Sequence, residues 1–287
     1  MSSYNTPQET AEAAVASGTA KAAASPAHAL VGGFLGGAYI AFGSLLAIVA
    51  SAGLAPETWG GITTLITGVT FSLGLVLVMV AGADLLTGSM MLLPLALLRR
   101  RIAASRLVAN WGLVLVGNLV GALVVAYFLA DQTGVIGSVT SAAGTPAASS
   151  FARLTTLTVG KAVSESDYQV FLRAIGCNWM VCLGVWMAIS AKDVAGKILA
   201  VVFPVTAFVA LGFDHVVANF FFLPLAMMQH VPGVTFAHVI SNLVFALLGN
   251  IVGAGLFVAG AYWFLYLKDK PATDAPAAVA PKQRAKR

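Results

Sequence analysis

Charged residues are scarce in this chain. Only 9% of its 287 residues are Asp, Glu, Lys or Arg, whereas 59% are hydrophobic. Soluble domains carry charge on about a quarter of their residues, so this composition lies outside their usual range. Between Lys197 and Lys268 there is no Lys or Arg, and Asp214 is the one carboxylate in that run. The composition therefore excludes an ordinary soluble fold and predicts an integral membrane protein.

Cysteine is almost absent as well. The two cysteines, Cys177 and Cys182, lie five positions apart in one predicted span. Because an α-helix turns by about 100° per residue, they fall on different helix faces, which argues against a disulfide or a shared metal ion. We interpret both as small packing residues.

Motifs of several enzyme and channel classes are missing. No Gly-x-Ser-x-Gly sequence occurs, so the nucleophile turn of α/β-hydrolases is absent. No Asn-Pro-Ala sequence occurs either, which argues against a water or glycerol channel. His215 is the only histidine expected inside a span, and one His with an Asp and an Asn is a poor set of transition-metal ligands. We therefore expect no catalytic residues, no metal and no cofactor.

The apolar segments are long enough to cross a bilayer six times, which predicts an all-α membrane protein. A helical span needs roughly 20 apolar residues. The segments that fit best are 30–52, 61–98, 107–130, 168–190, 198–228 and 236–267. With a cytoplasmic N-terminus, thirteen basic residues fall inside and three outside, a strong positive-inside signal. We expect both termini in the cytoplasm, at the inner cell membrane, and read the net charge of +5 as an orientation signal rather than a nucleic-acid site.

Polar segments flank the spans. We expect residues 1–27 to form a cytoplasmic N-terminal segment with a short surface helix, because Ala and Glu favour helix. Residues 28–268 would form the transmembrane domain. Residues 269–287 are rich in Ala, Pro, Lys and Arg and are predicted to be a disordered cytoplasmic tail.

The second and fifth predicted spans are unlike the others. The second would form a helix of about 57 Å at 1.5 Å per residue, nearly twice the hydrocarbon thickness. Both spans contain an Asp followed ten residues later by a Pro, at Asp84 and Pro94 and at Asp214 and Pro224. Non-helical backbone at membrane depth is tolerated only where protein or a watery cavity satisfies it. We therefore expect both spans to break near their acids.

A second pattern repeats at nearly the same spacing. Residues 117–122 read Gly-Asn-Leu-Val-Gly-Ala and residues 249–254 read Gly-Asn-Ile-Val-Gly-Ala, a displacement of 132, against 130 for the two acids. We interpret the chain as two three-span copies, about 28–130 and 165–268. Because three is odd, the second copy is inverted, and inverted repeats place their site near the membrane midplane. Asp84 and Thr87 should face Asp214, His215 and Asn219 there.

Two cationic or titratable residues stand out for function. His215 holds or releases a proton near neutrality, although a buried histidine that donates to a backbone carbonyl is the structural alternative. Lys161 lies in the outer connection just before the fourth span, and a cation at a pore mouth raises the local anion concentration. An ordinary solvated loop lysine is the alternative for Lys161.

Several segments, in order, resemble the formate/nitrite transporter family over roughly residues 28–268. They are Gly36–Ile40, Ala83–Gly88, Asn110-Trp111 with Gly117–Gly121, Cys177–Leu183, and Gly212–His215 through Asn219. The resemblance implies an aquaporin-like six-span protomer with broken second and fifth helices, assembled as a homopentamer with a pore through each subunit.

The resemblance also implies roles for individual residues. They are His215 as the central histidine, Thr87 as the threonine of the broken second span, Phe71 and Phe208 as the outer constriction, Leu75, Leu85 and Val181 as the inner constriction, Asn178 and Asn219 at the pore, Lys161 in the outer vestibule, and Asp84 and Asp214 as supporting acids. Two departures are visible in this sequence. The acids are commonly Glu in the family, and Val216 stands where a Ser is frequent.

These observations predict a channel for small monovalent anions, formate first and nitrite or hydrosulfide as the alternative, rather than an enzyme. A bare anion that crosses apolar rings loses its hydration at a large cost, so transient protonation is attractive. His215 could donate the proton, or the vestibule with Lys161 could draw the anion in while bulk water protonates it; the sequence leaves both open. From another class, a membrane-embedded enzyme could use Asp84, Asp214 and His215. Partners would be formate or nitrite, protons and the lipid bilayer.

Overall fold

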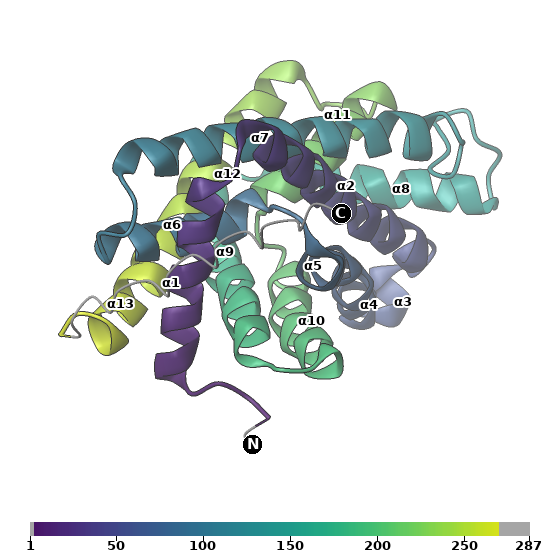
Figure 1. The fold of residues 1–287 in the computed structure, drawn as a ribbon. Coiled ribbons are helices and arrows are strands. Elements are labelled where there is room, and N and C mark those ends of the chain that lie inside the picture. The colour runs from purple at the N-terminus through teal and green to yellow at the C-terminus, as the bar shows by residue number, and fades with distance from the viewer. Residues whose placement is uncertain (1–2, 270–287) are drawn as a thin grey trace, which may run out of the picture.

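The computed structural model describes residues 3–269, and every regular element in this range is a helix. The elements are α1 (Pro7–Ala23), α2 (Pro26–Ser51), α3 (Pro56–Trp59), α4 (Ile62–Phe71), α5 (Leu73–Leu77), the π-helical η1 (Val78–Gly82), α6 (Leu86–Leu98), α7 (Ala104–Val124), η2 (Val125–Asp131), α8 (Pro146–Val159), η3 (Gly160–Ser164), α9 (Asp167–Ser190), α10 (Val194–Ala210), α11 (Val216–Met228), α12 (Phe236–Ala254), η4 (Gly255–Gly260) and α13 (Ala261–Tyr266). The predicted all-helical architecture is confirmed for this part of the chain (Figure 1). The predicted disordered tail lies, from residue 270 onward, outside the described residues.

Five helical stretches within residues 3–269 are long and apolar enough to cross a membrane. They are Pro26–Ser51, Ile62–Gly82, Ala104–Asp131, Asp167–Ser190 and Phe236–Tyr266. Each begins or ends within a few residues of a predicted span. The remaining predicted span, 198–228, divides into α10 and α11, of 17 and 13 residues.

The surface carries large apolar side chains that a soluble protein would bury. Phe203 is 74% exposed, Val108 66% and Leu265 63%. Extensive exposed apolar surface marks contact with other apolar material, such as lipid or a neighbouring subunit. Together with the long apolar helices, it identifies a multi-pass membrane protein.

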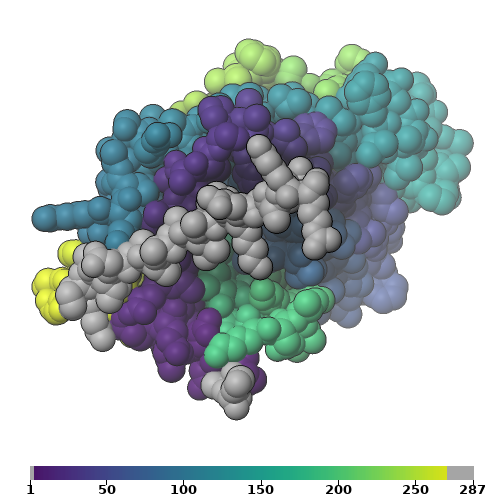
Figure 2. Space-filling view, viewed as in Figure 1, coloured from purple at the N-terminus to yellow at the C-terminus, as the bar shows by residue number. Residues whose placement is uncertain are grey.

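Helix α1 packs on the body of the protein rather than standing apart from it. Thr6 caps the helix in a reciprocal capping box with Glu9, which satisfies two free donors at the helix start. A β-carbon at Gly18 would lie 2.1 Å from the Leu92 carbonyl oxygen of α6, so the two helices touch backbone to backbone. Asn5 also donates its backbone N–H to the Ser190 carbonyl at the end of α9, over 2.8 Å. Figure 2 shows the purple N-terminal residues lying directly against the rest of the molecule.

The longest helices approach closely where the repeated Gly-Asn segments lie. A β-carbon at Gly121 of α7 would come within 2.0 Å of the Phe34 carbonyl oxygen of α2. At the repeated position, Gly253 of α12, it would come within 2.3 Å of the Ile175 carbonyl oxygen of α9. Small residues allow such close crossings between membrane helices. The α2–α7 and α9–α12 pairs, which cross in Figure 1, therefore have the same kind of contact in each half.

Two apolar helical stretches end at related positions, and the helices that follow them begin with buried residues. The chain leaves helical conformation after η1, and α6 begins at Leu86; it leaves it again after α10, and α11 begins at Val216. Gly82 and Gly212, each two residues before an Asp, have positive φ values of 89° and 71°. Only glycine adopts this backbone region without strain, so the local sequence dictates where each interruption starts.

The close α2–α7 crossing gives a direct test of this packing. We expect Gly121→Ala to destabilise the protein by about 1–3 kcal/mol, because the added methyl group overpacks the crossing. The measurement is thermal unfolding in detergent, followed by size-exclusion chromatography. Gly112→Ala on the same helix is the matched control, since no heavy atom lies within 4 Å of its added β-carbon. Equal unfolding temperatures for the two variants would contradict the proposed crossing.

Candidate functional site

The first interruption is closed by the side chain of Asn118 from α7. Its Oδ1 accepts the Leu86 backbone N–H over 2.9 Å. Its Nδ2 donates to the Asp84 carbonyl over 2.9 Å and to the Gly33 carbonyl over 2.6 Å. The Asn118 side chain is fully buried. One amide thus supplies the partners that the interrupted helix lacks, as the interior of a membrane protein requires.

The second interruption is closed in the same way by Asn250 from α12. Its Oδ1 accepts the Val216 backbone N–H over 2.9 Å. Its Nδ2 donates to the Asp214 carbonyl over 2.9 Å and to the Ala174 carbonyl over 2.8 Å. The two asparagines are the residues displaced by 132 in the sequence. The repeated motif therefore marks repeated hydrogen bonding as well as helix packing.

Thr87 and His215 meet between the two interruptions. The Thr87 Oγ1 lies 2.9 Å from His215 Nε2, and both residues are almost completely buried. His215 is also the N-cap of α11, since its Nδ1 accepts the Ala218 backbone N–H over 3.1 Å. A ring nitrogen that accepts carries no proton, so this pattern assigns the neutral ring with its hydrogen on Nε2, donating to Thr87. If the ring takes up a second proton at Nδ1, its hydrogen bond from the Ala218 N–H is lost.

Two aromatic rings pack near His215. The Phe208 ring centroid is 6.0 Å from that of His215, and Phe71 packs edge-on against Phe208 with centroids 5.8 Å apart. All three line a cavity of about 160 Å³. Phe71 and Phe208 thus lie together, as the family resemblance implied, and form an apolar wall beside the Thr87–His215 pair.

Lys161 lies in η3 and binds Asp214. It also lines the cavity of about 160 Å³, which we call the outer cavity because the predicted topology places it on the outside. Its Nζ lies 2.8 Å from Asp214 Oδ1 and 3.3 Å from the Phe213 carbonyl oxygen. The Asp214 side chain is completely buried. Paired in this way, the lysine offers the cavity a neutralised cation rather than a free one.

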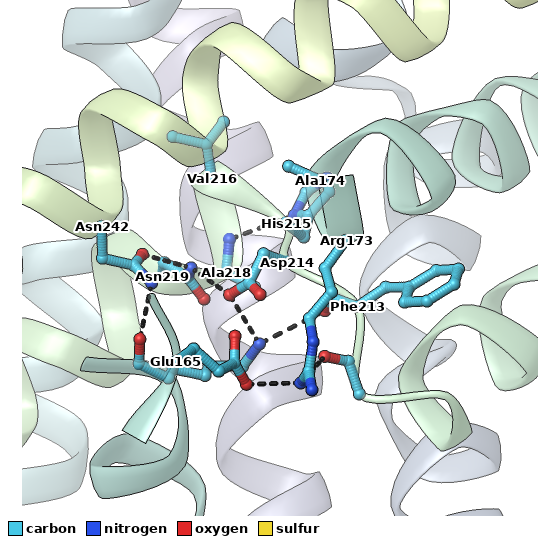
Figure 3. Close-up of polar contacts among 12 residues, drawn as sticks. Glu165, Arg173, Ala174, Phe213, Asp214, His215, Val216, Ala218, Asn219 and Asn242 are labelled. Atoms are coloured by element: carbon cyan, nitrogen blue, oxygen red, sulfur yellow. Dashed lines mark hydrogen bonds and ion pairs between the residues drawn. The ribbon is translucent and has the colours of Figure 1, made fainter. Parts of the chain in front are cut away.

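Asn219 holds this ion pair in place. Its Nδ2 donates to Asp214 Oδ1 over 3.0 Å and to Asn242 Oδ1 over 2.7 Å. Asn242 in turn donates to the Lys161 carbonyl over 3.0 Å. Figure 3 shows Asn242, Asn219 and Asp214 gathered in one polar cluster. Asn219 also lines the outer cavity, but its amide donor is directed at the ion pair.

A second acid adjoins this cluster in the connection before α9. Glu165 Oε1 lies 2.5 Å from Arg173 Nη1 (Figure 3). Burial and the negative charge of Asp214 raise the pKa of the Glu165 carboxyl to about 7, even though Lys161 and Arg173 act to lower it. Burial of the carboxyl is the largest of these effects, and the attraction of Arg173, which is 38% exposed, is the smallest.

The first half carries a matching ion pair. Lys21 at the end of α1 binds Asp84 Oδ1, and Asn110 donates to the Lys21 carbonyl over 3.1 Å. This mirrors the contacts of Lys161, Asp214 and Asn242. Asp84 also lines an open cavity of about 660 Å³ beside the start of α2. Each acid thus binds a lysine from the segment that precedes its half, while Thr87 and His215 make a contact between the halves.

Lys21 and Asn110 were not predicted as site residues. From the sequence, Lys21 is only one of the thirteen basic residues expected on the inside. A signal was present, because Asn110 and Asn242 are displaced by 132, the same displacement as Asn118 and Asn250. That spacing links both polar positions of α7 to their counterparts in α12.

The remaining predicted residues lie in the interior. Asn178 donates to the Thr87 carbonyl over 3.2 Å and to the Asn250 carbonyl over 2.8 Å. Its amide thus links the start of α6 to α12. Leu75, Leu85 and Val181 are each at most 3% exposed and belong to the apolar core. None of these four is among the residues that line the outer cavity.

Comparison with known proteins gives consistent matches. Residues 8–264 match the formate/nitrite transporter family. A protein of Methanothermobacter thermautotrophicus named as a probable formate transporter is 43% identical over 274 residues, covering 93% of this chain and 99% of that protein.

Two solved structures are similar in fold. One, an FNT family ion channel, has a TM-score of 0.80 and 28% identity, covering 90% of this chain and 98% of its own. The other, described as a pentameric formate channel with formate bound, has a TM-score of 0.72 and 27% identity, covering 84% of this chain and 98% of its own.

The raised pKa of Glu165 predicts a pH-dependent stability. Between pH 4.5 and about 7 the folded protein binds a proton at Glu165 that the unfolded chain has already lost. The stability that this proton contributes is present in full below pH 4.5 and is lost as the pH rises through about 7. We therefore expect wild type to lose stability relative to Glu165→Gln over this range, by about 2–4 °C if roughly 1 kcal/mol survives solvent screening. The measurement is the unfolding temperature in detergent at several pH values. Glu57→Gln, at an exposed carboxyl, is the control, and a Glu165→Gln difference that does not change with pH would disprove the assignment.

Proposed function

This chain belongs to the formate/nitrite transporter family, and we propose that it is a channel for small monovalent anions with formate as its first substrate. The family comprises transporters rather than enzymes. The similar proteins named above are a probable formate transporter and a formate channel. Nitrite is the alternative within the family, and hydrosulfide is a further small anion to be tested beside it.

The observation that carries this proposal is the set of groups gathered at the outer cavity. Cationic side chains, the Phe71–Phe208 wall and His215 all line it, and Thr87 contacts His215. The wall favours loss of hydration, and the Thr87 hydroxyl, which accepts from His215, keeps a hydrogen that suits a carboxylate or nitrite oxygen. Leu75, Leu85 and Val181 would form the inner apolar constriction.

A six-span inverted repeat would organise this path. In this proposal residues 28–268 form an aquaporin-like channel domain with halves of about 28–130 and 165–268, whose second and fifth spans are broken. Support comes from the paired hydrogen bonds of Asn118 and Asn250 and from the positive-φ glycines Gly82 and Gly212. Matching contacts in two halves of a membrane protein are typical of such repeats.

We further propose that the protein forms a homopentamer with a pore through each subunit, at the inner cell membrane. One similar structure is described as pentameric. The excess of basic residues in the connections predicted to be inside supports cytoplasmic termini. Exposed apolar side chains such as Phe203 would contact lipid or the neighbouring subunit.

Proton linkage has two possible sources. If His215 supplies the proton, the ring must first take one up at Nδ1 and give up its hydrogen bond to the Ala218 N–H. If the vestibule acts instead, the positive charge of its lining, to which Lys161 contributes together with Arg153, draws the anion toward the aromatic wall, and water protonates it there. The hydrogen bonds of His215 favour the second route, because the neutral ring has no proton that it can release at low cost.

The test is uptake by proteoliposomes of formate, nitrite, lactate and hydrosulfide, measured side by side across a range of pH. His215→Asn is the key variant, since Asn does not titrate and is itself a favoured N-cap. We expect this variant to retain the pH dependence of formate uptake and Lys161→Gln to weaken it. Loss of pH dependence in His215→Asn, with assembly intact, would assign the proton to the histidine. Wild-type protein that takes up none of the small anions would refute the proposed function.

A further inference from the structure

The outer cavity has two cationic side chains in its lining, Arg153 and Lys161. Their surroundings differ. Lys161 is paired with the buried Asp214 carboxylate at 2.8 Å. Among the described residues no carboxylate lies within ion-pairing distance of Arg153. The uncompensated positive charge of the cavity is therefore that of Arg153.

Arg153 is held in a defined position by neutral groups. Its Nε donates to Ser51 Oγ over 2.9 Å and its Nη2 donates to Thr67 Oγ1 over 2.8 Å. The Ser51 and Thr67 hydroxyls donate to the backbone carbonyls of Ala47 and Thr63, respectively. Their oxygens are therefore free to accept from Arg153. The guanidinium is thus fixed between the end of α2 and α4, and its Nη1 has no partner within residues 3–269.

Burial disfavours the charged form of Arg153. The loss of water lowers the pKa of the guanidinium, and no neighbouring acid opposes this effect. A guanidinium nevertheless stays protonated in proteins. A half-buried cation that has lost water and gained no counter-charge is stabilised by any anion that reaches it.

The position of Arg153 suits the first contact with an anion from outside. Arg153, Leu157 and Lys161 are spaced four residues apart along α8 and η3, and all three line the outer cavity. Residues four apart share one helix face. Arg153 also lines a shallower cavity of about 240 Å³, together with Ser149 and Pro56. The guanidinium thus lies where the shallower cavity meets the one that leads to the aromatic wall.

We propose that Arg153 is the outer capture site for the permeant anion, binding a planar carboxylate or nitrite through the edge of its guanidinium that carries Nη1. A guanidinium matches two oxygens of such an anion with parallel N–H groups, which a lysine ammonium does not. This assignment rests on the proposed function. It gives Lys161, whose charge is already neutralised, a different task beside the aromatic wall.

The experiment is formate uptake by proteoliposomes at a pH where formate is fully ionised, over a range of outside concentrations. Arg153→Gln keeps a donor for Ser51 and Thr67 but removes the charge. We expect its half-saturating concentration to rise about three- to tenfold, as for the loss of a partly screened charge-assisted contact, with the maximal rate little changed. Its half-saturating concentration should also depend less on ionic strength than that of wild type.

Two further variants keep the test decisive. Arg153→Lys retains the charge without the planar fork, so it should restore part of the affinity while losing preference for formate and nitrite over chloride as competitors. Arg106→Gln removes one positive charge at an exposed site in the first turn of α7 and should leave the half-saturating concentration unchanged. Arg153→Lys also serves if Arg153→Gln does not assemble.

Unchanged half-saturation in Arg153→Gln, or a fall in maximal rate alone, would overturn the capture site and leave formate transport standing. Equal competition by chloride in wild type and Arg153→Lys would overturn the planar mode of binding. Wild-type vesicles that transport neither formate nor nitrite would instead overturn the proposed function itself.

Discussion

The structure depends on closing two interrupted helices in a place where water cannot do so. Each interruption leaves backbone groups without helical partners, and such groups are costly in an apolar interior. Asn118 and Asn250 each supply one acceptor and two donated hydrogen bonds from a single buried amide. The two interruptions can then approach from opposite halves, and Thr87 meets His215 between them. Without the asparagines the backbone groups at each interruption would lack these buried partners.

Charge is arranged around that junction and kept out of it. Two acids, Asp84 and Asp214, each bind a lysine from the segment that precedes their half. Removing one partner from a buried pair leaves an uncompensated charge, which costs several kcal/mol, about 3–5 in measured cases. The pairs are therefore best understood as fixed elements that frame the path. The centre itself presents a hydroxyl, a neutral imidazole and aromatic rings, groups that can contact an anion without trapping it as a fixed cation would.

Sequence patterns predicted the outline of this arrangement. Apolar length predicted the long helices. The two acids, each followed ten residues later by a proline, predicted where helices end, because an acid at membrane depth has few other uses. The repeated acids, displaced by 130 residues, predicted that Thr87 and His215 face each other, and the two side chains are in contact.

The partners of the polar side chains were less predictable. Lys21 and Arg153 contributed only to the count of basic residues used for topology. A single sequence does not say that Lys21 pairs with Asp84, 63 residues away, or that Arg153 donates to Ser51 and Thr67. Asn178 is predicted at the pore from the family resemblance, but the sequence did not indicate that its amide donates to the carbonyl groups of Thr87 and Asn250. Such contacts depend on how helices cross, which hydrophobic periodicity does not encode.

The central claim is that His215 is a neutral N-cap that donates through Nε2 to Thr87. The most direct measurement is ¹⁵N solid-state NMR of the protein in lipid at the pH of the transport assay, with His215→Asn used to assign the signals. The account predicts one protonated nitrogen, at Nε2, and one unprotonated nitrogen that accepts a hydrogen bond, at Nδ1. A ring protonated at both nitrogens, or one with its hydrogen at Nδ1, would contradict it.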